Sequence, residues 1–402
     1  MTFDPPSPRL FPEVGRELRL RDRGVLPYEH LRELIADGVL QADPSIEDDQ
    51  LQPASVDLRL GKFALQVRAS FLPGRQSTVL QAAQDLLVQE IDLEKGAVLQ
   101  KGAVYIIPVL ESLDLGSTSG LLAKANPKST TGRLDVFARL ITDRADQFDI
   151  IERGYNGPMF AEVSPKTFSV RVQVGTRLNQ LRFLRGRSAT SHASRKASED
   201  EALVFDERGE PLKATVDSGI WFSVDLSGAG GDAIIGWKAK SETPVIDLEQ
   251  IGHYDPLEFW DAVRPSKQLI LTPDAFYILG SKERVRVPPT YAAEMLPYDQ
   301  AMGEFRVHYA GFFDPGFGYG SGELQGTRAI LEVRSHEIPY ALKDGQRIGR
   351  LMYERMLAVP ERLYGVNTNS SYQQQGKSHP AHESLPCSTA EPCVCCLMRG
   401  LL

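Results

Sequence analysis

The sequence lacks cysteine throughout its first 386 residues, because all four cysteines lie close to the end of the chain. A disulfide framework therefore does not hold the fold. The sequence also has no run of about 18 apolar residues and no charged start followed by an apolar segment, which excludes the usual signals for a membrane span or secretion. We therefore predict a cytoplasmic protein without a membrane partner.

An excess of positive charge is missing as well. Lys and Arg number 45 against 53 Asp and Glu, which gives a formal net charge of −8. Without a basic stripe interleaved with aromatic residues, no nucleic-acid partner is expected. A nucleotide site remains compatible with this balance, since it needs only a few local cations.

Turn-forming residues are plentiful, with 34 Gly and 26 Pro among 402 residues. This composition favours a β-rich chain, and its length favours two domains. Residues 27–40 have the spacing of an amphipathic helix, whereas residues 52–60, 98–110 and 168–184 have strand-like patterns. Residues 186–200 are small, polar and charged, and we predict a linker or loop there.

Four short segments recur in the same order along the chain. Residues 55–58, 91–94, 103–106 and 161–163 resemble residues 223–226, 246–249, 275–278 and 331–333. We interpret this as an internal duplication of a unit built mostly from short strands. The predicted fold is mainly β, with two tandem barrel-like domains at 1–200 and 201–377 and a disordered tail at 378–402.

The residues most suggestive of chemistry lie between positions 126 and 162. Lys128, Ser129 and Arg133 come close together, and Glu162 follows in an apolar strand. A cation, a hydroxyl, a guanidinium and a carboxylate could serve a nucleotide-handling hydrolytic site. The same pattern also describes a buried Arg–Glu pair that bridges two strands, so two interpretations stay open.

The second copy lacks part of this set. At the corresponding places it has Ala301 and Phe305 instead of a Ser-x-x-x-Arg motif, although Glu332 answers to Glu162. A scaffold that folds without the hydroxyl and the guanidinium favours a chemical role for Ser129 and Arg133. We interpret the isolated Glu332 as structural.

Three segments, LQPASVDLRLG, NPKSTTGRLDVF and GYNGPMFAEV, resemble the dCTP deaminase branch of the dCTP deaminase/dUTPase family. The resemblance covers residues 25–185 and, more weakly, 215–376, as in a long two-domain form. It implies distorted β-barrel or jelly-roll-like domains with the dUTPase fold. It also implies a homo-oligomer with trimer-like barrel packing and active sites between subunits.

The resemblance assigns catalytic roles to three residues. Glu162 would activate the water that attacks cytosine C4. Ser129 would contact phosphate or the water, and Arg133 would orient the glutamate. Lys128 would face the triphosphate.

Further substrate contacts follow from the same resemblance. Glu152 and Tyr155 occupy the family's Ile-Asp-x-Gly-aromatic segment near the sugar, with Glu152 in place of the family's Asp. Tyr364, Tyr372 and Gln374 resemble the family's C-terminal lid over the triphosphate.

The implied reaction is hydrolysis of dCTP to dUTP and ammonia, for dUMP and dTTP supply. One alternative is a dUTPase or a bifunctional enzyme that releases dUMP and diphosphate, and another is a non-catalytic deoxynucleotide-binding regulatory protein. Mg²⁺ is expected with the triphosphate, and dTTP is a possible feedback inhibitor. No zinc is expected. Residues 392–396 match only the Pro-Cys-x-x-Cys half of a zinc deaminase signature, without a correctly spaced His-x-Glu.

Overall fold

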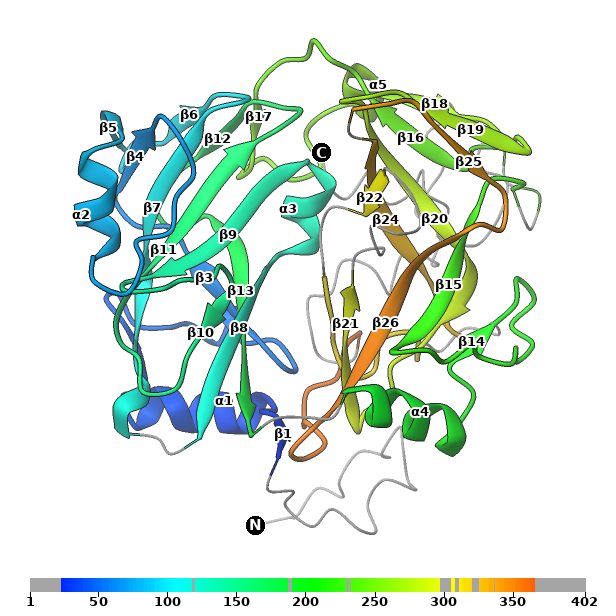
Figure 1. The fold of residues 1–402 in the computed structure, drawn as a ribbon, viewed down its shortest axis with the longest axis horizontal. Helices are drawn as coiled ribbons and strands as arrows, with labels where there is room; N and C mark the ends of the chain where they lie inside the picture. Colours follow the sequence, from blue (N-terminus) through cyan, green and yellow to red (C-terminus); the bar gives the residue numbers. More distant parts are fainter. Residues whose placement is uncertain are drawn as a thin grey trace, which may run out of the picture.

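The computed structural model describes residues 23–117, 120–186, 190–228, 231, 233–296, 305–307, 311–319, 325–335 and 337–365. Two β-rich halves lie side by side, the first drawn from blue to green and the second from green to orange (Figure 1). The expected class, mainly β with few short helices, is confirmed. Within the described part of the chain, no helix is long and apolar enough to cross a membrane.

The described residues of the first half contain thirteen strands and five helical segments. The strands are β1 (Gly24–Val25), β2 (Leu40–Ala42), β3 (Val56–Arg59), β4 (Phe63–Val67), β5 (Leu87–Asp92), β6 (Ala97–Leu99), β7 (Val104–Asp114), β8 (Leu121–Pro127), β9 (Val136–Thr142), β10 (Ile150–Ile151), β11 (Asn156–Pro165), β12 (Val170–Val172) and β13 (Arg177–Arg185). The helical segments are α1 (Tyr28–Ala36), α2 (Val79–Gln84), α3 (Ser129–Arg133) and the 3₁₀ turns η2 (Asp48–Gln50) and η3 (Leu115–Ser117).

The described residues of the second half form the remaining elements. The strands are β14 (Val204–Phe205), β15 (Ile220–Asp225), β16 (Gly236–Ala239), β17 (Ile246–Asp247), β18 (Trp260–Val263), β19 (Gln268–Leu271), β20 (Phe276–Val285), β21 (Tyr291–Leu296), β22 (Phe305–Val307), β23 (Phe312–Phe313), β24 (Thr327–Ser335), β25 (Tyr340–Lys343) and β26 (Arg347–Arg355). The helices are α4 (Thr190–Asp200) and α5 (Pro256–Phe259).

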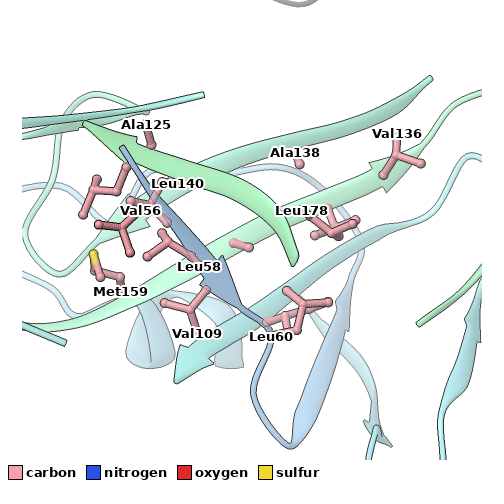
Figure 2. Packing of buried hydrophobic residues seen from close by; sticks show 14 of the residues in the cluster. Val56, Leu58, Leu60, Val109, Ala125, Val136, Ala138, Leu140, Met159 and Leu178 are labelled. Atoms are coloured by element: carbon pink, nitrogen blue, oxygen red, sulfur yellow. The ribbon is translucent and has the colours of Figure 1, made fainter. Parts of the chain in front are cut away.

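Two sheets form the body of the first half. One has the order β5-β4-β7-β11-β9, with β2 also on β7, and the other has the order β1-β13-β8-β10, with β3 also on β13. Apolar side chains from both sheets fill the space between them (Figure 2). Val136, Ala138 and Leu140 alternate along β9 toward this core, as expected for a strand with one buried face.

The second half repeats the central pairing of the first. Tyr105 on β7 pairs with Val163 on β11, and Tyr277 on β20 pairs with Val333 on β24. Each tyrosine hydroxyl also accepts a hydrogen bond from the backbone N–H five residues earlier. The duplication inferred from residues 103–106 and 161–163 therefore corresponds to the same register in both halves.

The other two repeated segments do not occupy equivalent positions. In the first half, Val56 of the repeated segment pairs with Leu181 on β13. In the second half, Leu351 on β26 takes the place of Leu181, and it pairs with Ile220, which lies outside the repeated segment 223–226. The second copy of residues 91–94 enters β17, which pairs with β12 of the first half. These two matches were wrong because short polar–apolar alternation recurs in many strands.

Residues 190–200 form the helix α4, so the prediction of a linker or loop over 186–200 was wrong for most of that segment. Ala193, Ser194 and Ala197 are buried at helical spacing, and the Ser194 hydroxyl accepts a hydrogen bond from the Tyr353 N–H at 3.1 Å. The small side chains let the helix lie against β26, and the surrounding polar residues concealed this periodicity.

The two halves are joined by a strand of the second half that pairs with the first half, and by a shared apolar core. β17 of the second half pairs in parallel with β12 of the first half, and Arg171 bonds to Asp247 at 3.1 Å. Phe168 packs edge-on against Trp260, with ring centroids 5.3 Å apart. This junction fixes the relative position of the halves and places side chains of one against those of the other.

Candidate active site

The helix α3 positions the hydroxyl and the guanidinium predicted from the sequence. Lys128 is its extended N-cap residue, Ser129 is exposed at its first turn, and Arg133 is buried at its end. The Thr131 hydroxyl donates to the Leu178 carbonyl at 2.9 Å and ties the helix to β13. Residues four apart share a helix face, so Ser129 and Arg133 can serve one site.

Arg133 meets a carboxylate of the other half. Its Nε lies 4.0 Å from Oε1 of Glu332, and both side chains are less than one-tenth exposed. Glu332 lies on β24, where it pairs with Ile278 of β20. The junction between the halves therefore brings together a guanidinium of the first copy and a glutamate of the second.

Burial dominates the chemistry of Glu332. Desolvation raises its pKa to about 7, and the charge of Arg133 opposes this shift. A carboxyl with a pKa near neutrality can take up a proton and release it again, as a general acid–base group must.

Glu162 has a different partner. Its Oε1 accepts hydrogen bonds from both Nε and Nη2 of Arg139, the Nε bond being 3.1 Å long. Arg139 is held in turn by the Ser70 hydroxyl at 2.9 Å and stacks on Phe148, 3.5 Å from the ring centroid. Glu162 is thus paired with Arg139, whose own contacts are to residues of the first half.

The ion pairs among the described residues differ from the pairing expected from the sequence. Arg133 was expected to orient Glu162, but the described ion pairs join Arg133 to Glu332 and Glu162 to Arg139. Glu332 was interpreted as an isolated structural carboxylate, but it lies beside Arg133. The resemblance implied a pairing within one copy, whereas in the structure Arg133 and Glu162 have different surroundings.

Lys128 forms a salt bridge with Asp57, which lies near a second buried acid, Asp314. Its Nζ bonds to Oδ2 of Asp57, a buried residue of β3. Asp57 lies close enough to Asp314 for its charge to help raise the pKa of Asp314 to about 6, mainly a result of burial. The fully buried Arg182 donates to Asp314 Oδ1 at 3.2 Å.

Asp314 is the functional candidate that the sequence analysis missed. Asp314, Gly316 and Phe317 carry the Asp-x-Gly-aromatic pattern of the family, which Glu152 breaks in the first copy. The pattern itself was the available signal. The absence of the Ser and Arg makes the second copy look degenerate and hides this signal.

Tyr364, predicted to begin the lid, packs on this segment. Its backbone N–H donates to the Pro315 carbonyl at 2.9 Å, and its ring lies 5.4 Å from that of Phe317. Gly316 makes the approach possible, since a Cβ there would lie 3.1 Å from both Leu363 Cβ and Tyr364 N. Tyr372 and Gln374 lie outside the described residues.

Glu152 and Tyr155 lie in another part of the first half. They line a cavity of about 550 Å³ whose other lining residues all fall within positions 75–156. The Tyr155 hydroxyl donates to the Pro158 carbonyl at 2.5 Å, and burial raises its pKa to about 12. Neither Ser129 nor Arg133 lines this cavity, so the first copy does not unite its own predicted residues.

Comparison with known proteins identifies the chain. Residues 22–187 match the model of the 2'-deoxycytidine 5'-triphosphate deaminase N-terminal domain, and residues 190–381 match that of the C-terminal domain. A crystal structure of 2'-deoxycytidine 5'-triphosphate deaminase from Agrobacterium tumefaciens is 47% identical, with a TM-score of 0.78. The match covers 84% of this chain and all of that one. The chain belongs to the dCTP deaminase family.

More distant members of the dCTP deaminase family also match. A "dCTP deaminase" of Halorubrum lacusprofundi is 26% identical over 205 residues, 50% of this chain and 95% of that protein. A "dCTP deaminase, dUMP-forming" of Halobacterium salinarum is 29% identical over 140 residues, 34% of this chain and 67% of that protein. The suspected family and its dUTPase-like fold are thus confirmed.

Proposed function

We propose that this chain hydrolyses dCTP to dUTP and ammonia at a site shared by its two halves. The observation that carries the proposal is the 4.0 Å approach of Arg133 to Glu332 across the junction. Ser129 and Lys128 lie on the Arg133 side, whereas Asp314 and Tyr364 lie on the Glu332 side. Each half supplies what the other lacks.

The departures of the two copies from the family pattern are complementary, which supports this assignment. The first copy keeps the Ser-x-x-x-Arg motif but has Glu152 where the family has Asp. The second copy has lost the Ser and Arg but keeps Asp314 in its Asp-x-Gly-aromatic segment. A single site at the junction needs only the parts that each copy retains.

In the proposed mechanism, Glu332 acts as general base and then general acid. Water adds to cytosine C4 as its proton passes to the carboxylate. Glu332 delivers this proton to N3, which gives a tetrahedral intermediate with hydroxyl and amine on C4. The carboxylate then takes the proton of the C4 hydroxyl and passes it to the amine, so that the C4–O double bond forms as the C4–N4 bond breaks and ammonia leaves. A pKa near 7 suits both directions of transfer, and Arg133 keeps part of the carboxyl population ionised.

The remaining groups would bind the nucleotide. The Ser129 hydroxyl and the Lys128 ammonium would face phosphate or the attacking water, and Asp314 would accept a hydrogen bond from a sugar hydroxyl. Tyr364 stands where the lid over the triphosphate would begin. Mg²⁺ would be bound mainly by phosphate oxygens, and the described residues contain no cluster of three or more His, Cys, Asp or Glu residues able to hold a metal ion.

The decisive experiment compares Glu332→Gln with Glu162→Gln. Both variants are assayed with dCTP, and ammonia and the nucleotide product are measured. The proposal expects Glu332→Gln to lose about 10²–10⁴-fold in kcat, the usual contribution of a general acid–base group. The reverse result, with only Glu162→Gln inactive, would return the catalytic role to the carboxylate predicted first.

A second outcome concerns the product. A relative from Halobacterium salinarum bears the name "dCTP deaminase, dUMP-forming", which favours testing for release of dUMP and diphosphate. Chromatography of the nucleotide products separates dUTP from dUMP. The homo-oligomeric assembly, inhibition by dTTP and the cytoplasmic location stay predictions.

A further inference from the structure

A second polar cavity lies at the junction, apart from the candidate active site. It has a volume of about 640 Å³ and is lined by residues of both halves. We call this cavity the basic pocket, because five cationic residues line it: Lys101, Lys166, Lys238, Lys240 and Arg334. Its acidic lining residues are Asp261 and Asp274, so positive charge is in excess.

Three of the cations already have partners. Lys240 lies 3.8 Å from Asp261 and donates to the Leu257 carbonyl at 2.6 Å. Lys101 donates to the Ser241 carbonyl at 3.2 Å, a contact that crosses the junction.

Arg334 bonds to Asp135, a residue behind the lining of the pocket, and to the Thr167 hydroxyl at 2.9 Å. It also donates to the Asp274 carbonyl at 2.6 Å. These bonds fix the guanidinium at one wall.

Lys166 and Lys238 differ from the others. Among the described residues, neither has a carboxylate within 4.0 Å, and each ammonium lies more than 5 Å from the centre of an aromatic ring, Phe137 or Tyr277. Burial lowers the pKa of Lys166, and the negative charges of Asp135 and Glu162 oppose this shift. Two ammonium groups from opposite halves thus line one cavity, and neither has a salt bridge among the described residues.

We propose that the basic pocket binds a phosphate-bearing polyanion, a di- or triphosphate chain held by Lys166 of the first half and Lys238 of the second. Phosphate oxygens are the acceptors that clustered ammonium groups recognise. A chain of linked phosphates can reach both walls, which a single small anion does less well. The source can be free polyphosphate or the triphosphate of a nucleotide.

The site is separate from the one proposed for deamination. Arg334 follows Glu332 by two residues on β24, yet neither Glu332 nor Arg133 lines the basic pocket. An anion that joins Lys166 to Lys238 would bridge the two halves and stabilise their junction by mass action.

Titration calorimetry with inorganic tripolyphosphate tests the proposal on the full chain. We expect binding by the wild type and at least about a tenfold loss of affinity in the double variant Lys166→Gln, Lys238→Gln, since each removed ammonium–phosphate contact is worth about that factor. The matched control Lys62→Gln, Lys213→Gln removes the same charge from exposed positions outside the pocket. It should bind like the wild type.

A further variant separates the two sites. Lys128→Ala removes a cation of the candidate active site and should leave the tripolyphosphate binding in place. Binding that disappears in Lys128→Ala but persists in the double variant would overturn the proposal. Equal loss in the double variant and in its matched control would overturn it too.

ATP distinguishes the source of the phosphates. Affinity equal to that of tripolyphosphate shows that the chain alone is recognised, and tighter binding identifies a nucleotide as the ligand. Failure of both to bind the wild type would overturn the proposal. None of these measurements requires turnover of dCTP, so they stay decisive whatever the outcome of the deaminase assay.

Discussion

The Nε atom of Arg133 lies 4.0 Å from Oε1 of Glu332, and the two residues belong to different copies of the duplicated unit. The pair is buried, and the charge of Arg133 opposes the rise that burial gives to the pKa of Glu332. Several measurable consequences follow from this contact.

The first prediction concerns the pH dependence of turnover. If Glu332 is the base, it must be ionised before it can accept a proton from water. Because its pKa is raised to about 7, kcat/KM should rise with pH and level off above that value. A profile already flat from pH 5 to 8 would contradict the assignment.

Replacement of Arg133 should change that profile in a defined direction. Arg133 lowers the pKa of Glu332, so its removal in Arg133→Met should move the rising limb to higher pH. Loss of the guanidinium should also lower kcat about 10²-fold, as for removal of one preorganised donor. Arg133→Lys is the control, because it keeps the charge and should leave the limb nearer its original position.

Stability should respond to pH through the same group. The pKa of Glu332 is raised from 4.5 to about 7, so the folded chain binds more protons than the unfolded chain between these values. This contribution is fully present below pH 4.5 and is lost as pH rises through 7, a change on the order of 3 kcal/mol. Thermal unfolding at pH 5 and pH 8 should therefore differ less in Glu332→Gln than in the wild type.

Two other buried carboxyls should leave some pH dependence of stability in the Glu332→Gln variant. The carboxyls of Asp314 and Asp149 also have pKa values raised by burial, to about 6 and about 7. Both act in the same direction as Glu332. A Glu332→Gln chain that loses as much stability as the wild type over this range would show that Glu332 titrates normally.

Mixing inactive chains should not restore activity. Arg133→Ala and Glu332→Gln each damage the one site formed within a chain, so co-refolded mixtures should remain as inactive as the separate variants. Recovery of a clear fraction of wild-type turnover would show that Arg133 of one chain serves Glu332 of another. Mixtures of either variant with wild type provide the reference for complete refolding.

Gly316 should be sensitive to the smallest substitution. Its φ of +93° disfavours any side chain, and an added Cβ would press on Leu363 and Tyr364. Gly316→Ala should cost about 1–3 kcal/mol of stability and raise the KM for dCTP as Tyr364 is displaced. Gly345→Ala, at a φ of +72° with open space around its Cβ, is the matched control for strain alone.

The sequence predicted the β-rich, duplicated architecture better than it predicted which side chains contact one another. Registers such as Tyr105 with Val163 follow from strand patterns that alternation reveals, and the same register returns at Tyr277 and Val333. Local patterns could not show that Arg133 and Glu332 meet, because that contact depends on how one sheet packs against another. The Ser-x-x-x-Arg spacing pointed to Ser129 and Arg133 but carried no information about the contact of Arg133 with Glu332.

Two features of the structure were hard to predict from the sequence, each for its own reason. The helix α4 was mistaken for a linker because Ala193 and Ala197 are small, and their burial leaves little hydrophobic signal. Asp314 lies in the copy that has no Ser-x-x-x-Arg motif, so that motif could not point to it. Comparison of Glu152 with Asp314 at the matching motif would have pointed to the second copy.

The pairing of β17 with β12 of the first half has a consequence for how the protein unfolds. Its residues complete the sheet edge at β12, and Ile246 is buried in the core of the first half. The first half therefore depends on a strand of the second half, and an excised first half would expose an edge strand open to aggregation. We expect one cooperative melting transition for the described body rather than two, so the duplicated chain behaves as a single indivisible module.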